Sequence, residues 1–177
     1  MTAAGGTLEI ERVWVLRSMP TVPQGAERWE VDQGYLPTSA PLKGAGETAA
    51  DFPEGRLRRI LRPDGTESFR HTIKRGTGMV REETERSIDA EEFRRWWPST
   101  QGRRIAKTRY RIRERDLVWE LDEFHDLPLV MLEVELPHTT HAIELPTWAQ
   151  TLVVREVTND ARYRNAALAM TGMPTPP

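Results

Sequence analysis

The chain has 177 residues, of which 38% are hydrophobic and 29% are charged, and its formal net charge at pH 7 is −2. This length and composition suit one globular domain over residues 1–177 and exclude a chain that is disordered throughout. Because there is no cysteine, disulfides, thiolate metal sites and thiol nucleophiles are excluded, and the small net charge gives no indication of nucleic-acid binding.

The amino-terminal residues MTAAGGT lack the basic and apolar regions of a signal peptide. No apolar run approaches the ~18 residues that are needed to span a bilayer. We therefore expect a cytoplasmic protein that has neither a membrane nor a nucleic acid as its partner.

Short runs rich in valine, isoleucine and aromatic residues, with alternating apolar and polar positions, predict an antiparallel β structure. The expected strands cover residues 8–16, 29–36, 54–62, 67–75, 79–88, 104–114, 117–124 and 129–136. Residues 37–53 are rich in proline, glycine and alanine and predict a flexible loop.

Two helices are expected among these strands. The first covers 89–97, with Asp89 as its N-cap and Pro98 at its end. The second covers 160–170, with Asn159 or Asp160 as its N-cap, and residues 171–177 should fray.

The sequence R-P-D-G-T at 62–66 predicts a tight hairpin between the third and fourth strands. A type I turn followed by a left-handed glycine would pair Arg62 with Thr66. Facing residues then have numbers that sum to 128, so even-numbered residues of both strands share one face. This register gathers cations on that face: Arg56, Arg58, Arg62, Arg70 and Lys74.

Carboxylates also recur at a spacing of two residues, which places both members of a pair on one face of a strand. The pairs within expected strands are Glu9/Glu11, Glu83/Glu85, Glu120/Asp122 and Glu133/Glu135, and Lys107/Arg109 repeats the spacing with cations. For any single pair, a hydrated outer face of a sheet is the ordinary explanation. Because each strand tends to carry one sign, the pattern as a whole favours an acidic and a basic wall that line a tunnel. Crowded carboxylates need cations, with Mg²⁺ or Mn²⁺ suiting oxygen ligands, and the basic wall suits phosphate.

The chain resembles the CYTH superfamily, also called triphosphate tunnel metalloenzymes, over nearly its whole length. The motifs that carry the resemblance are EIER at 9–12, QGYL at 33–36, RLR at 56–58, HTIK at 71–74, REETE at 81–85, GRRIAKTRY at 102–110, WELDEF at 119–124, LEVEL at 132–136 and RYRNAALA at 162–169. The resemblance implies an α+β fold in which an eight-stranded antiparallel β-barrel forms a tunnel flanked by helices. It also implies metal-dependent chemistry on a small molecule that contains a triphosphate group.

The resemblance implies roles for individual residues as well. The metal ion, Mg²⁺ or Mn²⁺, would be held by Glu9, Glu11, Glu133 and Glu135. The catalytic carboxylates would be Glu11, Glu120 and Asp122. The phosphates would be bound by Arg56, Arg58, Lys74, Lys107 and Arg109, with Glu83 and Glu85 on the acidic side and Arg162 or Arg164 at one tunnel mouth.

Val13 departs from the family's amino-terminal signature, which has a lysine two residues after the second glutamate. Valine can neither bind a phosphate nor position water. Arg12 points to the opposite face of a regular strand. Arg17 would share the face of Glu9, Glu11 and Val13, but only if the strand continues that far. The function expected from the resemblance is hydrolysis of inorganic triphosphate or of a triphosphate ester. The alternatives are cyclisation of ATP to cyclic AMP in the same tunnel and, because of Val13, binding of triphosphate or polyphosphate with little turnover.

Overall fold

The computed structural model describes residues 7–37 and 54–174. The predicted loop at 37–53 lies outside the described residues except for Pro37, and of the predicted frayed tail only 171–174 are described. Among the described residues, no helix is both long enough and apolar enough to cross a membrane.

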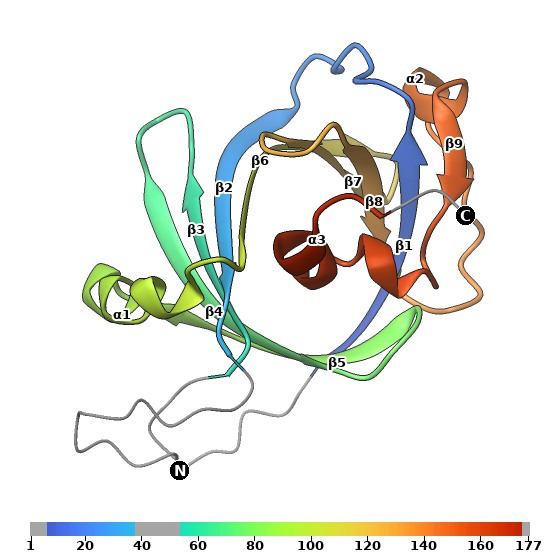
Figure 1. The fold of residues 1–177 in the computed structure, drawn as a ribbon. Helices are drawn as coiled ribbons and strands as arrows, with labels where there is room; N and C mark the ends of the chain where they lie inside the picture. Colours follow the sequence, from blue (N-terminus) through green and yellow to red (C-terminus); the bar gives the residue numbers. More distant parts are fainter. Residues whose placement is uncertain (1–6, 38–53, 175–177) are drawn as a thin grey trace.

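Eight strands close into an antiparallel β-barrel (Figure 1). They are β1 (Thr7–Leu16), β2 (Glu27–Tyr35), β3 (Arg56–Leu61), β4 (Glu67–Arg75), β5 (Val80–Ile88), β6 (Arg104–Glu114), β7 (Leu117–Phe124) and β8 (Val130–Glu135). Neighbouring strands follow the order β5-β4-β3-β2-β6-β7-β8-β1, and the pairing of β1 with β5 closes the ring. The predicted barrel is therefore confirmed, with strand bounds within about two residues of those expected from the sequence.

Two short elements were not expected from the sequence. Strand β9 (Val153–Glu156) pairs with the end of β1 outside the ring, and helix α2 (Thr147–Gln150) precedes it. Each has four residues, which is too short for the apolar periodicity of a helix or of a strand to be recognised in the sequence.

The hairpin between β3 and β4 has the predicted turn. The Arg62 amide donates to the Thr66 carbonyl at 3.0 Å, and the Gly65 amide donates to the Arg62 carbonyl at 2.9 Å. Gly65 has a φ of +82°, a value that favours glycine. The register pairs Arg58 with Arg70, so the even-numbered residues of both strands do share one face.

The first predicted helix is confirmed as α1 (Ala90–Trp96), and the Asp89 carboxylate accepts a hydrogen bond from the Glu92 amide at 2.8 Å. Pro98 ends it by lying in the first turn of a 3₁₀ helix at Trp97–Thr100.

The second predicted helix, 160–170, is wrong as one continuous element. Asp160 caps only a 3₁₀ turn at Ala161–Tyr163, and α3 (Asn165–Thr171) follows it. Arg164 separates the two with extended dihedral angles of φ −68° and ψ 139°. This bend allows α3 to turn across the barrel end, where Leu168 packs with Val13 and Met131.

The apolar core has two main parts on opposite sides of the barrel wall. Outward-facing side chains that include Trp14, Trp119 and Leu132 pack beneath the segment that contains α2. A second cluster, which includes Phe124 and Leu168, packs α3 against inward-facing side chains at one end of the barrel. Viewed along the barrel, α3 lies within the outline of the ring (Figure 1). The interior is therefore apolar at the end covered by α3, and charged side chains fill the rest.

Candidate functional site

A cavity of about 1060 Å³ occupies the barrel interior and is lined by residues of all eight barrel strands and of α3. Inward-facing carboxylates lie on β7, β8, β1 and β5, which are consecutive in the ring. This acidic wall comprises Glu120, Asp122, Glu133, Glu135, Glu9, Glu11, Glu83 and Glu85. The basic wall on β6, β3 and β4 comprises Lys107, Arg109, Arg111, Arg56, Arg58 and Lys74. The spacing of single-sign pairs along the sequence becomes this separation of charge once the ring closes.

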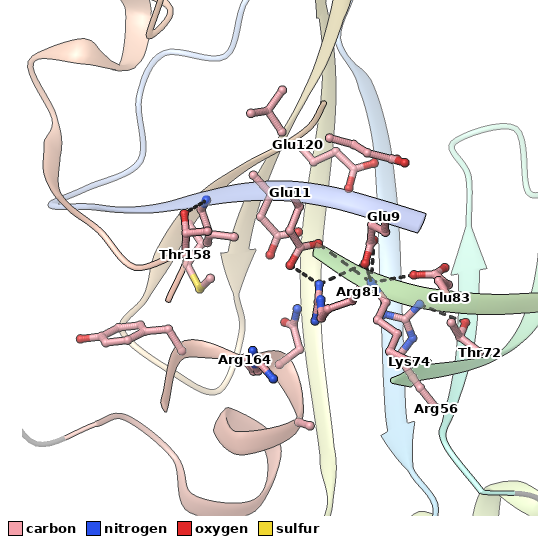
Figure 2. Close-up of a pocket in the computed structure, with 18 of the residues that line it drawn as sticks. Glu9, Glu11, Arg56, Thr72, Lys74, Arg81, Glu83, Glu120, Thr158 and Arg164 are labelled. Carbon is pink, nitrogen blue, oxygen red and sulfur yellow. Dashed lines mark hydrogen bonds and ion pairs between the residues drawn. The ribbon is translucent and has the colours of Figure 1, made fainter. Parts of the chain in front are cut away.

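The β1–β5 pairing that closes the barrel lies within the acidic wall, and Lys74 reaches it from the adjacent strand β4 of the basic wall (Figure 2). The ammonium group of Lys74 lies 2.6 Å from both carboxylate oxygens of Glu9 and 2.7 Å from Glu83 Oε2. Arg81 Nη2 donates to Glu9 Oε2 at 3.1 Å and also to Glu11. The carboxylates at this seam are thus held by one cation from each wall.

Negative charge nevertheless exceeds what these cations balance. Burial and the charge of Glu133 raise the pKa of Glu11 from 4.5 to about 7. Burial and the charges of Glu9 and Glu83 raise the pKa of Glu135. Among the described residues, no group of three or more acidic or histidine side chains is already arranged as a metal site. Even so, the crowded carboxylate oxygens around Glu11 and Glu135, whose pKa values are raised, fit a hard divalent cation.

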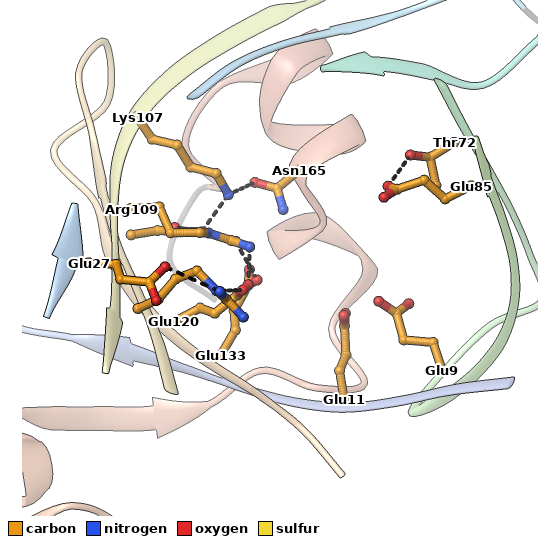
Figure 3. Close-up of polar contacts among 12 residues, drawn as sticks. Glu9, Glu11, Glu27, Thr72, Glu85, Lys107, Arg109, Glu120, Glu133 and Asn165 are labelled. Atoms are coloured by element: carbon orange, nitrogen blue, oxygen red, sulfur yellow. Dashed lines mark hydrogen bonds and ion pairs between the residues drawn. The ribbon is translucent and has the colours of Figure 1, made fainter. Parts of the chain in front are cut away.

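Asp122 lies at the centre of a buried ion cluster that includes Lys107 and Arg109, which Figure 3 labels. It accepts hydrogen bonds from Lys107 and, at 2.6 Å each, from Nε and Nη2 of Arg109. Burial alone would raise the pKa of Asp122, but the charges of Arg109 and Lys107 hold it at about 2. Arg109 also donates to Glu133 at 2.8 Å and to Glu120. Both oxygens of Asp122 are therefore engaged in fixing the cations of the basic wall.

This cluster is tied to α3 as well. Lys107 Nζ donates to Asn165 Oδ1 at 3.1 Å, and Asn165 is the first residue of that helix. The position of α3 across the barrel end is consequently linked to the buried charges of β6 and β7.

Arg58 stands out on the basic wall because no described carboxylate lies within ion-pairing distance of it. Its Nε is buried without a hydrogen-bond partner among the described residues. Burial and the charges of Arg56 and Arg109 lower the pKa of Arg58 to about 10. Arg56 itself donates to Thr72 at 3.0 Å and lies 3.6 Å from Glu85. An anion in the cavity would relieve this repulsion.

Most of the predicted site residues line the cavity. These are Glu9, Glu11, Arg56, Arg58, Lys74, Glu83, Glu85, Arg109, Glu120, Glu133, Glu135 and Arg164. Lys107 and Asp122 are fully buried instead, and Asp122 forms ion pairs with both Lys107 and Arg109. Of the two arginines expected at the tunnel mouth, the structure places Arg164 in the lining, whereas Arg162 is exposed and bonded to Asp160 at 2.8 Å.

Sequence reasoning missed several lining residues, among them Tyr35, Thr72, Arg81, Arg111 and Asn165. A usable signal existed for two of them. Arg81 continues the alternation of Glu83 and Glu85, and Arg111 continues that of Lys107 and Arg109.

Val13 lines the cavity and is 8% exposed, facing Glu133 in the β1–β8 register. Arg12 is on the outer face, where its Nε donates to Glu156 of β9 at 2.9 Å. Arg17 follows the end of β1. Neither of these neighbouring arginines places a charge at the position of Val13.

No protein-family model matches the chain. The chain is 36% identical over 167 residues to an inorganic triphosphatase of Nitrosomonas europaea, and the alignment covers 92% of this chain and 97% of that protein. A stretch of 66 residues is 39% identical to an inorganic triphosphatase of Acetivibrio thermocellus, covering 36% of this chain and 40% of that protein. A crystal structure of an inorganic triphosphatase matches with a TM-score of 0.57 and 34% identity over 92% of this chain and 95% of that chain.

Proposed function

The chain belongs to the CYTH superfamily, the triphosphate tunnel metalloenzymes, and on this premise we propose that it hydrolyses triphosphate, as inorganic triphosphate or as a triphosphate ester, with Mg²⁺ or Mn²⁺. The observation that carries the proposal is Arg58, a guanidinium group that faces the cavity beside Arg56 and Arg109 without a carboxylate partner among the described residues. The curated relatives named inorganic triphosphatase support the choice of substrate class.

The basic wall would bind and orient the phosphate chain. Arg56 and Arg58 approach the cavity from β3 and Arg109 approaches it from β6, so phosphate oxygens would be held from two sides. Arg109 is fixed by Asp122 and Glu120, and this preorganised guanidinium would stabilise negative charge as it develops on the leaving oxygen. In this proposal Glu120 and Asp122 contribute by fixing Arg109.

The acidic wall would repel a phosphate chain unless its charge were neutralised. Glu9, Glu11, Glu133 and Glu135 would hold the divalent cation, which would neutralise the charge of the carboxylates and of the phosphate chain. Glu11 would also orient the attacking water and accept its proton. The water oxygen would attack the terminal phosphorus, and the P–O bond to the rest of the chain would break.

The test is phosphate release from inorganic triphosphate with Mg²⁺, with Mn²⁺ and with chelator, beside Glu133→Gln. Glu123→Gln, an exposed position on β7, is the matched control. We expect release that requires the metal ion and falls at least about 100-fold in Glu133→Gln, in the range lost when one transition-state contact is removed. Absence of release from folded protein would refute hydrolysis of inorganic triphosphate and leave a triphosphate ester as the substrate to test, and cyclic AMP formed from ATP would favour a cyclase.

A further inference from the structure

Arg81 is the one cation among the described inward-facing residues on the four strands of the acidic wall. It lies at the seam that closes the barrel, where its Cα is paired with that of Glu9. Its side chain is 10% exposed, and Nη2 contacts both Glu9 and Glu11. Its Nε is buried without a hydrogen-bond partner among the described residues. Arg81 therefore uses one nitrogen to hold two carboxylates and keeps a further donor free within the cavity lining.

The neighbouring position on β1 supplies no charge. Val13 is the next inward-facing residue after Glu11, and it packs among apolar side chains that include Met131 and Val157. Among the described residues on the four strands of the acidic wall, the cation that contacts Glu9 and Glu11 therefore comes from β5, and it is Arg81.

We propose, resting on the proposed function, that Arg81 is a substrate-binding residue that couples cation binding to phosphate binding on the acidic wall. While Glu9 and Glu11 carry no divalent cation, Arg81 holds them. Because a guanidinium group and a divalent cation repel each other at the same oxygens, Arg81 must release these carboxylates when they bind the cation. Its Nη2 and its free Nε can then donate together to phosphate oxygens, a geometry that suits arginine.

This proposal predicts effects of opposite sign from one substitution. Arg81→Met removes a competitor for Glu9 and Glu11, so Mn²⁺ alone should bind about tenfold more tightly, the size expected for losing one charged hydrogen-bonded contact. The same change removes a donor to phosphate, so KM for triphosphate should rise about tenfold. If Arg81 had only a structural role, its loss would weaken both.

The experiment titrates Mn²⁺ without triphosphate by electron paramagnetic resonance of the free ion, and then measures KM and kcat for phosphate release. The variants are Arg81→Met, Arg81→Lys, Val13→Lys and the double variant Val13→Lys/Arg81→Met. Arg86→Met is the matched control, since Arg86 lies on β5 but pairs outside the barrel with Glu92 at 3.0 Å. Arg81→Lys keeps the charge, so its Mn²⁺ affinity should stay within about threefold of the wild type.

Val13→Lys gives an independent arm that leaves Arg81 intact. A lysine beside Glu11 adds a second competitor, so Mn²⁺ should bind more weakly, and in the double variant part of the KM loss should be recovered. The inference fails if folded Arg81→Met binds Mn²⁺ more weakly than the wild type, or if its KM is unchanged. Should Arg81→Met not fold, unchanged Mn²⁺ affinity in Val13→Lys would overturn it. If the wild type releases no phosphate, hydrolysis of inorganic triphosphate is refuted, while the Mn²⁺ titrations still decide whether Arg81 competes with the cation.

Discussion

Replacing Glu11 with glutamine should change how the stability of the metal-free protein depends on pH. In the folded state the pKa of Glu11 is about 7, raised from 4.5 by burial and by Glu133. Between these pH values the folded protein therefore binds more protons at this site than the unfolded chain does. The free energy of unfolding must then decrease as the pH rises from about 4.5 to about 7.

The size of this decrease follows from the same shift. At about 1.4 kcal/mol for each pH unit, the interval corresponds to on the order of 3 kcal/mol. Below pH 4.5 the carboxyl group is protonated in both states and contributes no difference. Above pH 7 it is ionised in both states, and the folded protein bears the full cost of a charge buried beside Glu133.

The assay is urea unfolding at pH 5, 6, 7 and 8 in the presence of chelator, on the wild type, Glu11→Gln and Glu123→Gln. Glu11→Gln should exceed the stability of the wild type by less than about 1 kcal/mol at pH 5 and by up to about 3 kcal/mol at pH 8. Adding Mg²⁺ should reduce this difference, because the cation stabilises the ionised carboxylates of the wild type. A wild type whose stability rises from pH 5 to 8 relative to Glu11→Gln would refute the reasoning.

Three further substitutions test other parts of the cavity. Arg58→Met should raise the free energy of unfolding by about 1 kcal/mol, because it relieves repulsion from Arg56 and Arg109, and it should weaken triphosphate binding. Urea unfolding would measure the first effect and calorimetric titration the second. A loss of stability would contradict the assignment of Arg58 as an unpaired anion-binding group. Asp122→Asn leaves Lys107 and Arg109 buried without their carboxylate and should cost about 3–5 kcal/mol in urea unfolding, a cost that Glu123→Gln should not show. Gly34→Ala should lower the free energy of unfolding by about 1–3 kcal/mol, since the added Cβ would lie 2.5 Å from Thr100 Oγ1 and 2.8 Å from the Trp97 ring. Thermal unfolding would measure this loss, and an unchanged melting temperature would show that the 3₁₀ helix at Trp97–Thr100 moves to make room for the methyl group.

The barrel was predictable from the sequence because its determinants are local. Alternation within each strand and the turn chemistry of 62–66 define which side chains share a face, and the β3–β4 register followed directly. The α3 helix was misplaced because Asp160 carries a valid capping signal, whereas the bend at Arg164 depends on where the barrel end lies.

The site was predictable only in part, because its contacts join residues far apart in the chain. Spacing indicates that Glu9 and Glu11 share a face, but the β1–β5 register that places Arg81 beside them is a long-range pairing. Likewise, Lys107 and Asp122 both belong to recognisable pairs, but their complete burial behind Arg109 depends on packing across β6 and β7.

The closure of the barrel also constrains how the protein is made. Strand β1 contains the start of the acidic wall, yet its partners are β5, β8 and β9, so its last pairing requires residues 153–156. During synthesis the first strand must wait, unpaired on at least one edge, until most of the chain has been translated. Such long sequence separations slow folding, because the entropy of closing the loop is lost before the contacts form. The cavity would consequently be among the last features of the protein to form, and a chain that stops before β8 would expose the acidic edge of β1.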